Sequence, residues 1–238
     1  MSKRTALVAG GTSGIGLATA RKLRERGYEV HITGRGKEKL DDIAATDPEL
    51  TGHQADGGDA AAMAAVAESL GQVDVLVISL SGAEGAGPIA ELDLGGLRRA
   101  FDAKFWAHLT TIQAVLPRLA PAGSITLLTA ISARTGMPGT AGLAAINGAL
   151  EATVKPLAAE LAPIRVNAVS PGVVDTAWWS SMPAEQREPY FAQLAAALPT
   201  RQVGTAEDVA DGVVFVATNP NVTGTVLETD GGARLISL

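Results

Sequence analysis

Short apolar runs alternate with longer alanine-rich stretches along the whole chain. The short runs are rich in β-branched and other apolar residues and predict strands at residues 6–9, 29–33, 52–55, 73–78, 124–128, 164–169 and 226–229. The longer stretches predict helices at 14–26, 37–46, 59–70, 95–116, 139–161 and 206–218. Because continuous apolar strands alternate with helices, we expect an α/β fold whose doubly wound parallel sheet is covered on both faces.

Local signals mark several of the predicted helices. Asp59 suits the N-cap of the third helix, and Thr205-Ala-Glu-Asp208 resembles a capping box in which Asp replaces the usual Glu. Pro156 lies inside the helix predicted at 139–161 and has no N–H to donate, so we expect a kink near Lys155. No linker, repeat or change of composition divides the 238 residues, which predicts one domain over 1–238.

Composition narrows the classes of function. Lys plus Arg number 19 and Asp plus Glu 25, so the formal net charge of -6 argues against a nucleic-acid or anionic-membrane partner. Cysteine is absent, which excludes disulfides, thiolate metal sites and a cysteine nucleophile. The three histidines are too scattered to form a metal motif, and no apolar run approaches the ~18 residues of a membrane span. We expect a cytoplasmic protein without a metal.

A glycine-rich segment, Gly10-Gly-Thr-Ser-Gly-Ile-Gly16, joins the first predicted strand to the first predicted helix. Glycines at such a junction permit a tight turn, close approach of the backbone to a pyrophosphate, and close packing of the helix on the strand. The helix N-terminus adds unpaired N–H groups and a positive dipole end. We therefore expect a nucleotide to be bound by Gly10, Thr12, Ser13, Gly14, Ile15 and Gly16. The alternative is a plain connecting turn.

The end of the second predicted strand bears on which nucleotide is bound. The chain there reads Thr33-Gly-Arg-Gly-Lys37, with no carboxylate to bind a ribose 2′-hydroxyl. Arg35 together with Lys37 suits a 2′-phosphate instead, which favours NADP(H) over NAD(H). The alternative is that both cations are solvated loop residues.

The spacing of the glycine-rich segment resembles that of the short-chain dehydrogenase/reductase family, and the resemblance runs from end to end. Asp74-Val-Leu-Val77 resembles the start of that family's fourth strand, the segment 165–176 its region after strand six, and Asp230-Gly-Gly232 its C-terminal signature. The resemblance implies a single Rossmann-like domain, a nicotinamide nucleotide, a small-molecule substrate and a homodimer or homotetramer. It also implies cofactor contacts from Asp56, Ser79, Pro171, Gly172, Val174 and Thr176, beside a substrate lid at 176–200.

The catalytic pattern of that family is missing. The family uses an Asn on helix four, a Ser after strand five, and Tyr-x-x-x-Lys on helix five; the resemblance puts Lys104, Ala130, Leu143 and Asn147 at those positions. Tyr28 and Tyr190 are the only tyrosines, and neither has a lysine four residues later. Leucine has no proton to donate and asparagine carries no charge, so the ordinary mechanism does not transfer.

Relative to the family pattern, asparagine and lysine have changed places, with Lys104 at the Asn position and Asn147 at the Lys position. This exchange suggests a rebuilt catalytic site. We hypothesise that Lys104 supplies positive charge near the substrate or acts as a general acid, with Asn147 and Ser132 as further candidates. The alternative is a lysine that extends to solvent or to an interface carboxylate. Ser79, Ser81, Thr129, Ser132 and Arg134 end strands four and five, while Met137, Leu143, Trp178 and Trp179 suggest an apolar wall. Arg134 suits a substrate carboxylate or phosphate, or is plain surface, and His108 is better explained as a packed histidine.

Three functions therefore stay open. The favoured one is an NADP(H)-dependent oxidoreductase acting on a carbonyl or alcohol, with a proton relay built around Lys104, a hydroxyl or water. The second is a non-redox enzyme on the same fold. The third is a catalytically silent protein that binds NADP(H) and regulates or partners an active homologue, because fold alone does not establish activity.

Overall fold

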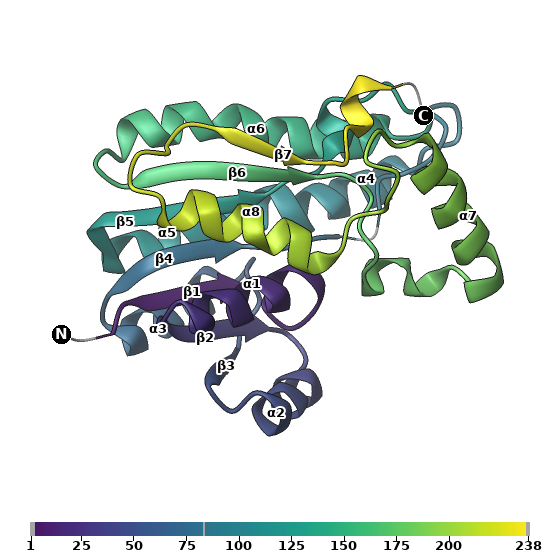
Figure 1. The fold of residues 1–238 in the computed structure, drawn as a ribbon. Helices are drawn as coiled ribbons and strands as arrows, with labels where there is room; N and C mark the ends of the chain where they lie inside the picture. Colours follow the sequence, from purple (N-terminus) through teal and green to yellow (C-terminus); the bar gives the residue numbers. More distant parts are fainter. Residues whose placement is uncertain (1–2, 83, 237–238) are drawn as a thin grey trace.

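The computed structural model describes residues 3–82 and 84–236 (Figure 1). Within those residues, seven parallel strands form one sheet in the order β3-β2-β1-β4-β5-β6-β7. The strands are β1 Thr5–Ala9, β2 Glu29–Gly34, β3 Leu50–Gln54, β4 Val73–Ile78, β5 Leu119–Leu128, β6 Arg165–Pro171 and β7 Val226–Thr229. This is the doubly wound sheet that the alternating pattern predicts, and its order reverses between β1 and β4.

Eight α-helices are present in the described part of the chain. They are α1 Gly14–Glu25, α2 Lys37–Thr46, α3 Ala60–Leu70, α4 Leu94–Phe101, α5 Ala107–Val115, α6 Ala141–Glu160, α7 Ala184–Ala197 and α8 Ala206–Thr218. Short 3-10 segments at 116–118, 131–133, 177–181 and 233–235 join some of them. Among these residues, no helix combines the length and apolarity needed to cross a bilayer.

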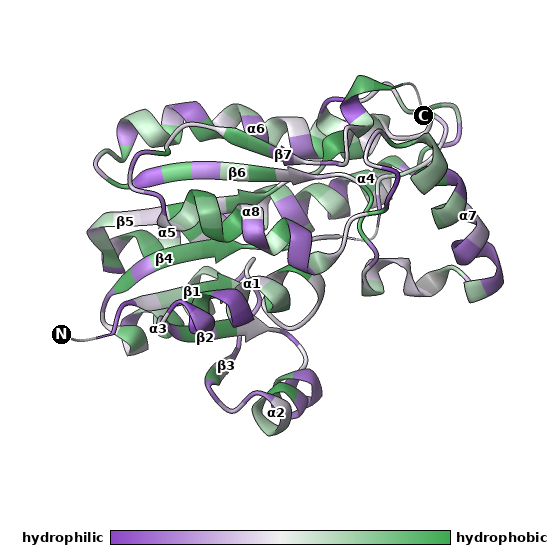
Figure 2. Ribbon diagram, in the orientation of Figure 1, coloured by the Kyte–Doolittle hydropathy of each residue, from purple (hydrophilic) through white to green (hydrophobic). Residues whose placement is uncertain are grey.

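The strands are apolar on both sides because each side packs against helices (Figure 2). On one side, Val8, Val30 and Ile32 pack with Leu23 of α1 and Val213 of α8. On the other side, a second core cluster joins sheet residues to helices α3, α5 and α6; it contains Leu7, Leu76, Ile125, Met63, Ile112 and Val154. Two buried layers on one sheet confirm the predicted α/β architecture.

Both predicted helix caps are present. The Asp59 carboxylate accepts a hydrogen bond of 3.0 Å from the backbone N–H of Ala62, at the start of α3. At α8, the Thr205 hydroxyl accepts from the Asp208 N–H at 3.1 Å, and the Asp208 carboxylate accepts from the Thr205 N–H at 2.9 Å. Aspartate therefore completes a capping box as glutamate ordinarily does.

Two predicted elements differ in the structure. The helix predicted at 95–116 contains a π-helical turn, Asp102–Trp106, between α4 and α5. Strand β5 begins at Leu119, five residues before the predicted start at 124.

Helix α6 agrees with the helix predicted at 139–161 and continues through Pro156. Pro156 lies on the exposed side, where water can solvate the carbonyl that loses its N–H partner. The kink near Lys155 stays a prediction.

The segment predicted as a lid lies at the carboxyl ends of the strands. It consists of the 3-10 turn Ala177–Ser181 and helix α7, which projects beyond the sheet (Figure 1). The sequence analysis predicts no helix there, since Pro189 and the weak apolar periodicity of 184–197 obscure it. Its position places α7 beside the edge at which parallel α/β sheets bind ligands.

Candidate active site

The glycine-rich turn lies at the point where the strand order reverses. Gly10 has a φ of +79°, and a Cβ there would lie 2.6 Å from the carbonyl oxygen of Ser79 at the end of β4. A Cβ on Gly16 would lie 2.2 Å from the carbonyl oxygen of Gly10, so α1 begins in direct contact with the turn. Only glycine fits these two positions, which brings Ser79 and the start of α1 to one edge of the sheet.

The N-terminus of α1 is open toward that edge. Ser13 occupies the N-cap, yet among the described residues its exposed hydroxyl makes no capping hydrogen bond. Gly14 has a φ of +50°, and a Cβ there would lie 3.4 Å from the Thr176 methyl group, so the predicted nicotinamide segment faces the turn. The N–H groups of Gly14, Ile15 and Gly16 fit an anion such as a pyrophosphate.

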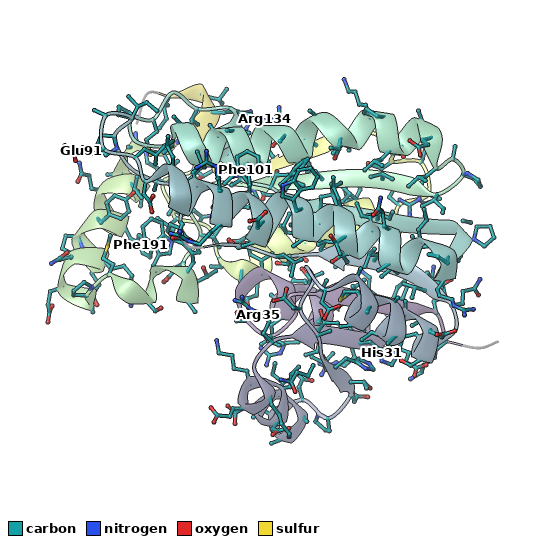
Figure 3. All side chains as sticks on the ribbon, turned by 180° about the vertical axis from the view of Figure 1, so that it is seen from behind. His31, Arg35, Glu91, Phe101, Arg134 and Phe191 are labelled. Atoms are coloured by element: carbon teal, nitrogen blue, oxygen red, sulfur yellow. The ribbon has the colours of Figure 1, made fainter. Side chains whose placement is uncertain are left out.

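The loop after β2 carries one cation with no counter-charge. Lys37 pairs with Asp41 at 2.7 Å, whereas exposed Arg35 has no ion-pair partner within residues 3–82 and 84–236. The Thr12 side chain packs against Gly34, which links this loop to the glycine-rich turn. Figure 3 shows Arg35 on the β2 side of the site and Arg134 on the α6 side. Arg35, rather than Lys37, is therefore the cation free to meet a phosphate.

The other predicted cofactor residues end neighbouring strands. Exposed Asp56 follows β3, and its carboxylate accepts a hydrogen bond of 2.9 Å from Gly58 N–H. After β6, Gly172 N–H donates to the Thr229 carbonyl at 3.2 Å, and the Val174 carbonyl accepts from the Trp179 indole at 3.0 Å. The loop from Pro171 to Thr176 is thereby held against β7 and the lid.

The π-helical turn carries Lys104 at its centre. Such turns are frequent at functional sites because one extra residue redirects the side chains around it. The Lys104 ammonium donates to the Thr129 carbonyl at 3.3 Å, at the end of β5. Burial lowers the pKa of Lys104 to about 8, while the Glu151 carboxylate opposes that shift. The described residues give this three-donor ammonium one recorded acceptor, so it retains donor capacity for a ligand.

Asn147 and Ser132, two of the predicted site residues, are in hydrogen-bonding contact. The Asn147 amide donates to the Ser132 hydroxyl at 3.1 Å and to the Leu143 carbonyl at 2.9 Å. Asn147 is only 3% exposed, and its Oδ1 has no hydrogen-bond partner among the described residues. A buried acceptor without a donor is costly, and this oxygen is enclosed by the described residues rather than open to a bound molecule.

Position 143 has no proton to give. The partly buried side chain of Leu143 lies one helical turn before Asn147, and Ala130 is the residue between Thr129 and the 3-10 turn. Neither Leu143 nor Ala130 carries a titratable or hydrogen-bonding side chain. A proton donor at this site would have to be another group, and Lys104 places an ammonium at the end of β5, where it bonds the Thr129 carbonyl.

Arg134 does not fit the predicted role of a free substrate-binding cation. Its guanidinium pairs with Glu151 at 2.9 Å and with Glu228 at 2.8 Å. Two carboxylates already use its charge, so a substrate carboxylate or phosphate would have to displace one of them. The Arg134 side chain is itself 34% exposed, whereas that of Glu151 is only 11% exposed, so the pair lies at the edge of the buried region. The sequence analysis misses Glu151, although its position one turn after Asn147 puts it on the same helix face.

His108 is a packed residue, as the sequence analysis favours. It is fully buried, with one ring nitrogen 2.7 Å from the Lys104 carbonyl and the other 3.2 Å from the Ile78 carbonyl. Burial and the Lys104 ammonium lower the pKa of His108 to about 3, so the ring stays neutral near pH 7. Among the described residues, no group of three or more His, Asp or Glu side chains is placed to hold a metal.

An aromatic cluster holds the lid together. The Trp179 ring lies 4.8 Å from that of Trp178, and 5.5 Å from those of Tyr190 and Phe191. Phe191 lies on α7 (Figure 3), so the cluster joins the 3-10 turn after Thr176 to that helix. Trp178 is 49% exposed and is the member available for further contacts. Trp179 therefore has the packing role, and Trp178 is the candidate for the apolar wall.

The sheet order and the turn at its reversal define a nucleotide-binding α/β protein of the doubly wound class. The family model described as enoyl-(acyl carrier protein) reductase matches residues 9–234. The cis-4-hydroxycyclohexanecarboxylate dehydrogenase of Sinomonas cyclohexanicum is 32% identical over 246 residues, covering 97% of this chain and 96% of that protein. The chain belongs to the short-chain dehydrogenase/reductase family.

Two solved structures share the whole fold. A small-chain dehydrogenase in complex with NADPH has a TM-score of 0.87 and 35% identity, covering 99% of this chain and 100% of that one. ElxO with NADP bound has a TM-score of 0.90 and 25% identity, covering 97% and 98%. Both similarities extend over the sheet, the glycine-rich turn and the lid, because they cover almost the entire chain.

Proposed function

We propose that this chain is an NADP(H)-dependent oxidoreductase that interconverts a carbonyl and an alcohol on a small molecule, with Lys104 as the proton donor and acceptor. A reduced nicotinamide would supply the hydride. The open N-terminus of α1 would hold the pyrophosphate, and Arg35 would hold the 2′-phosphate. The NADPH and NADP named for the similar solved structures support this assignment.

The observation that carries the proposal is the Lys104 ammonium at the end of β5. Hydride addition to a carbonyl carbon leaves negative charge on its oxygen, which an adjacent ammonium stabilises before giving up a proton. In the oxidation direction the neutral amine takes the alcohol proton as hydride leaves. The pKa of about 8 permits both forms near neutral pH. Ser132, held by Asn147, would orient the substrate oxygen.

The central experiment separates binding from chemistry. We expect Lys104→Met to remove turnover, by at least about 100-fold, while the NADPH dissociation constant stays unchanged, because Lys104 acts on substrate rather than on the pyrophosphate. Nicotinamide fluorescence measures binding, and loss of NADPH absorbance with a panel of carbonyl substrates measures turnover. Lys104→Arg keeps the charge but not a readily lost proton, and should stay inactive. Full turnover in Lys104→Met would refute the role.

A silent NADP(H)-binding protein is the second candidate. It is favoured by the combined absence of hydroxyl groups at Leu143 and Ala130, which removes two groups of the family pattern at once. Tight NADPH binding without oxidation by any carbonyl, including in crude extracts of small metabolites, supports this function and a partner role. Weak or absent binding of both NADPH and NADH argues instead for a non-redox enzyme on the same fold.

We also propose that the chain forms a homodimer or homotetramer. Trp106 is 54% exposed and Leu94 58% exposed, and both belong to the continuous helical run from α4 to α5. Phe105 stacks edge-on against Trp106 with ring centroids 4.9 Å apart, which widens the apolar surface. Large exposed aromatic residues are typical of interface cores. In this proposal each copy is a single nucleotide-binding domain over 1–238, and residues 176–200 form a lid over the substrate.

A further inference from the structure

Helix α6 presents a second polar residue to the site, one turn beyond Asn147. Glu151 shares the helix face that bonds the segment after β5, because residues four apart lie above one another on a helix. Its Oε1 accepts a hydrogen bond of 3.0 Å from the Thr129 hydroxyl. Its Oε2 lies 3.0 Å from Arg134 Nε and 2.9 Å from Arg134 Nη2. Both carboxylate oxygens are therefore engaged.

Thr129 connects this carboxylate to Lys104. The Thr129 side chain bonds Glu151 and also reaches the Val169 carbonyl at 3.2 Å, while the Thr129 backbone carbonyl accepts from the Lys104 ammonium at 3.3 Å. Thr129 is 3% exposed, so its peptide is fixed by neighbours rather than by water. Glu151 therefore helps to hold Thr129, together with the Val169 carbonyl, which also accepts from the Thr129 N–H at 2.9 Å.

Four charges alternate from the site to the surface. Lys104 faces Glu151, Glu151 pairs with Arg134, and Arg134 pairs with Glu228 on β7. A cavity of about 430 Å³ between α6 and β7, lined by Arg134, Glu151 and Lys155, gives water access to the outer part of this row. His108, the other titratable group against Lys104, stays neutral. Glu151 is thus the nearest countercharge to Lys104 in the described residues.

We propose that Glu151 is a positioning residue that orients Lys104 through Thr129 and keeps its ammonium protonated near neutral pH, and that Arg134 tempers this effect by sharing the carboxylate. This inference rests on the proposed function only for its catalytic meaning; the electrostatic coupling stands on the contacts themselves. Opposite charge favours the charged form of a group in a poorly hydrated site. Removing Glu151 and removing Arg134 must then shift the Lys104 pKa in opposite directions.

The test measures the Lys104 pKa directly in the cofactor-free protein. Lysine labelled with ¹³C at the ε-carbon gives one NMR signal for each of the six lysines, and the signal missing in Lys104→Met identifies Lys104. We expect Glu151→Gln to lower the pKa by roughly one pH unit and Arg134→Gln to raise it. Glu228→Gln, which alters only the outer end of the row, should change it least.

The outcomes separate this inference from the proposed function. An unchanged Lys104 pKa in Glu151→Gln would overturn the coupling. A fall of the pKa in both Glu151→Gln and Arg134→Gln would also overturn it, because looser packing alone would shift the pKa in the same direction in both variants. If Glu151→Gln fails to fold, Arg134→Gln alone still tests the coupling: the Lys104 pKa should rise in that variant, and an unchanged or lower pKa would overturn the coupling. Opposite shifts together with full turnover in Lys104→Met would retain the coupling and refute the catalytic role.

Discussion

Lys104 is the residue on which the proposed chemistry depends, and its titration should govern how turnover varies with pH. Its pKa of about 8 means that the proton needed for carbonyl reduction is lost as the pH rises through 8, whereas an ordinary lysine would keep it to about 10.4. We expect the reduction rate to be level below pH 8 and to fall about tenfold per pH unit above it. Alcohol oxidation should rise toward pH 8.

Steady-state rates in both directions, with saturating cofactor, measure these profiles. The mirrored dependence distinguishes titration of a proton donor from alkaline unfolding, which lowers both rates together. A reduction rate that stays level to pH 10 would contradict the assigned pKa. Circular dichroism over the same pH range provides the control for folding.

Arg35 is the residue that we propose sets the preference between NADPH and NADH. We expect Arg35→Asp to weaken NADPH binding by about tenfold or more and to strengthen NADH binding, because a carboxylate repels the 2′-phosphate and accepts from a 2′-hydroxyl. Lys37→Ala is the matched control: Lys37 already pairs with Asp41 and should change the ratio little. Dissociation constants follow from nicotinamide fluorescence, and an unaltered ratio in Arg35→Asp would remove Arg35 from the site.

At the residue scale, the sequence predicts a site residue well where the reason for that residue is local in the chain. The glycines at 10 and 16 are required by contacts of 2.6 and 2.2 Å with nearby backbone carbonyls, which the motif spacing anticipates. Arg134 differs, because its two partners, Glu151 and Glu228, come from α6 and β7. Ion pairs between residues far apart in the chain cannot be recognised from the sequence, so the sequence alone suggests that Arg134 is a free cation.

The π-helical turn is the feature at the scale of elements that positions Lys104. Deleting Ala103 removes one residue from this turn and should restore a regular helix, turning Lys104 relative to Thr129. We expect the Lys104 pKa to rise toward about 10.4 as its side chain regains water, and turnover to be lost. The same ¹³C signal of Lys104 measures the change.

Ala103→Ser keeps the length of this turn and serves as its control. It should leave both the Lys104 pKa and turnover close to wild type, because residue 103 is exposed. A deletion variant that retains a pKa near 8 would show that the turn does not determine the position of Lys104. The apolar periodicity of 95–116 predicts one regular helix, because the extra residue of a π-helical turn cannot be recognised from the amino-acid types around it.

At the scale of the whole molecule, the exposed helical run from α4 to α5 predicts self-association. We expect Trp106→Glu to weaken the association of two copies by on the order of 100-fold, because it puts an unpaired charge into an apolar contact. Sedimentation velocity measures the change in size. Phe215→Glu is the comparison, since Phe215 is 48% exposed but lies on α8, on the other face of the sheet. A monomeric wild-type protein would contradict the proposal.

The sequence by itself determined the alternation of strands with all helices but α7, the glycine-rich turn, and the loss of Tyr-x-x-x-Lys. These are local or countable properties: periodicity reports burial, glycine reports close backbone contact, and two tyrosines can be checked one by one. Only the tertiary structure decided that Lys104 bonds the end of β5 and that Glu151 engages both Thr129 and Arg134. It also decided that Asn147 Oδ1 is buried without a hydrogen-bond partner among residues 3–82 and 84–236. Those facts depend on which helix packs against which strand end, and therefore on contacts between residues far apart in the chain.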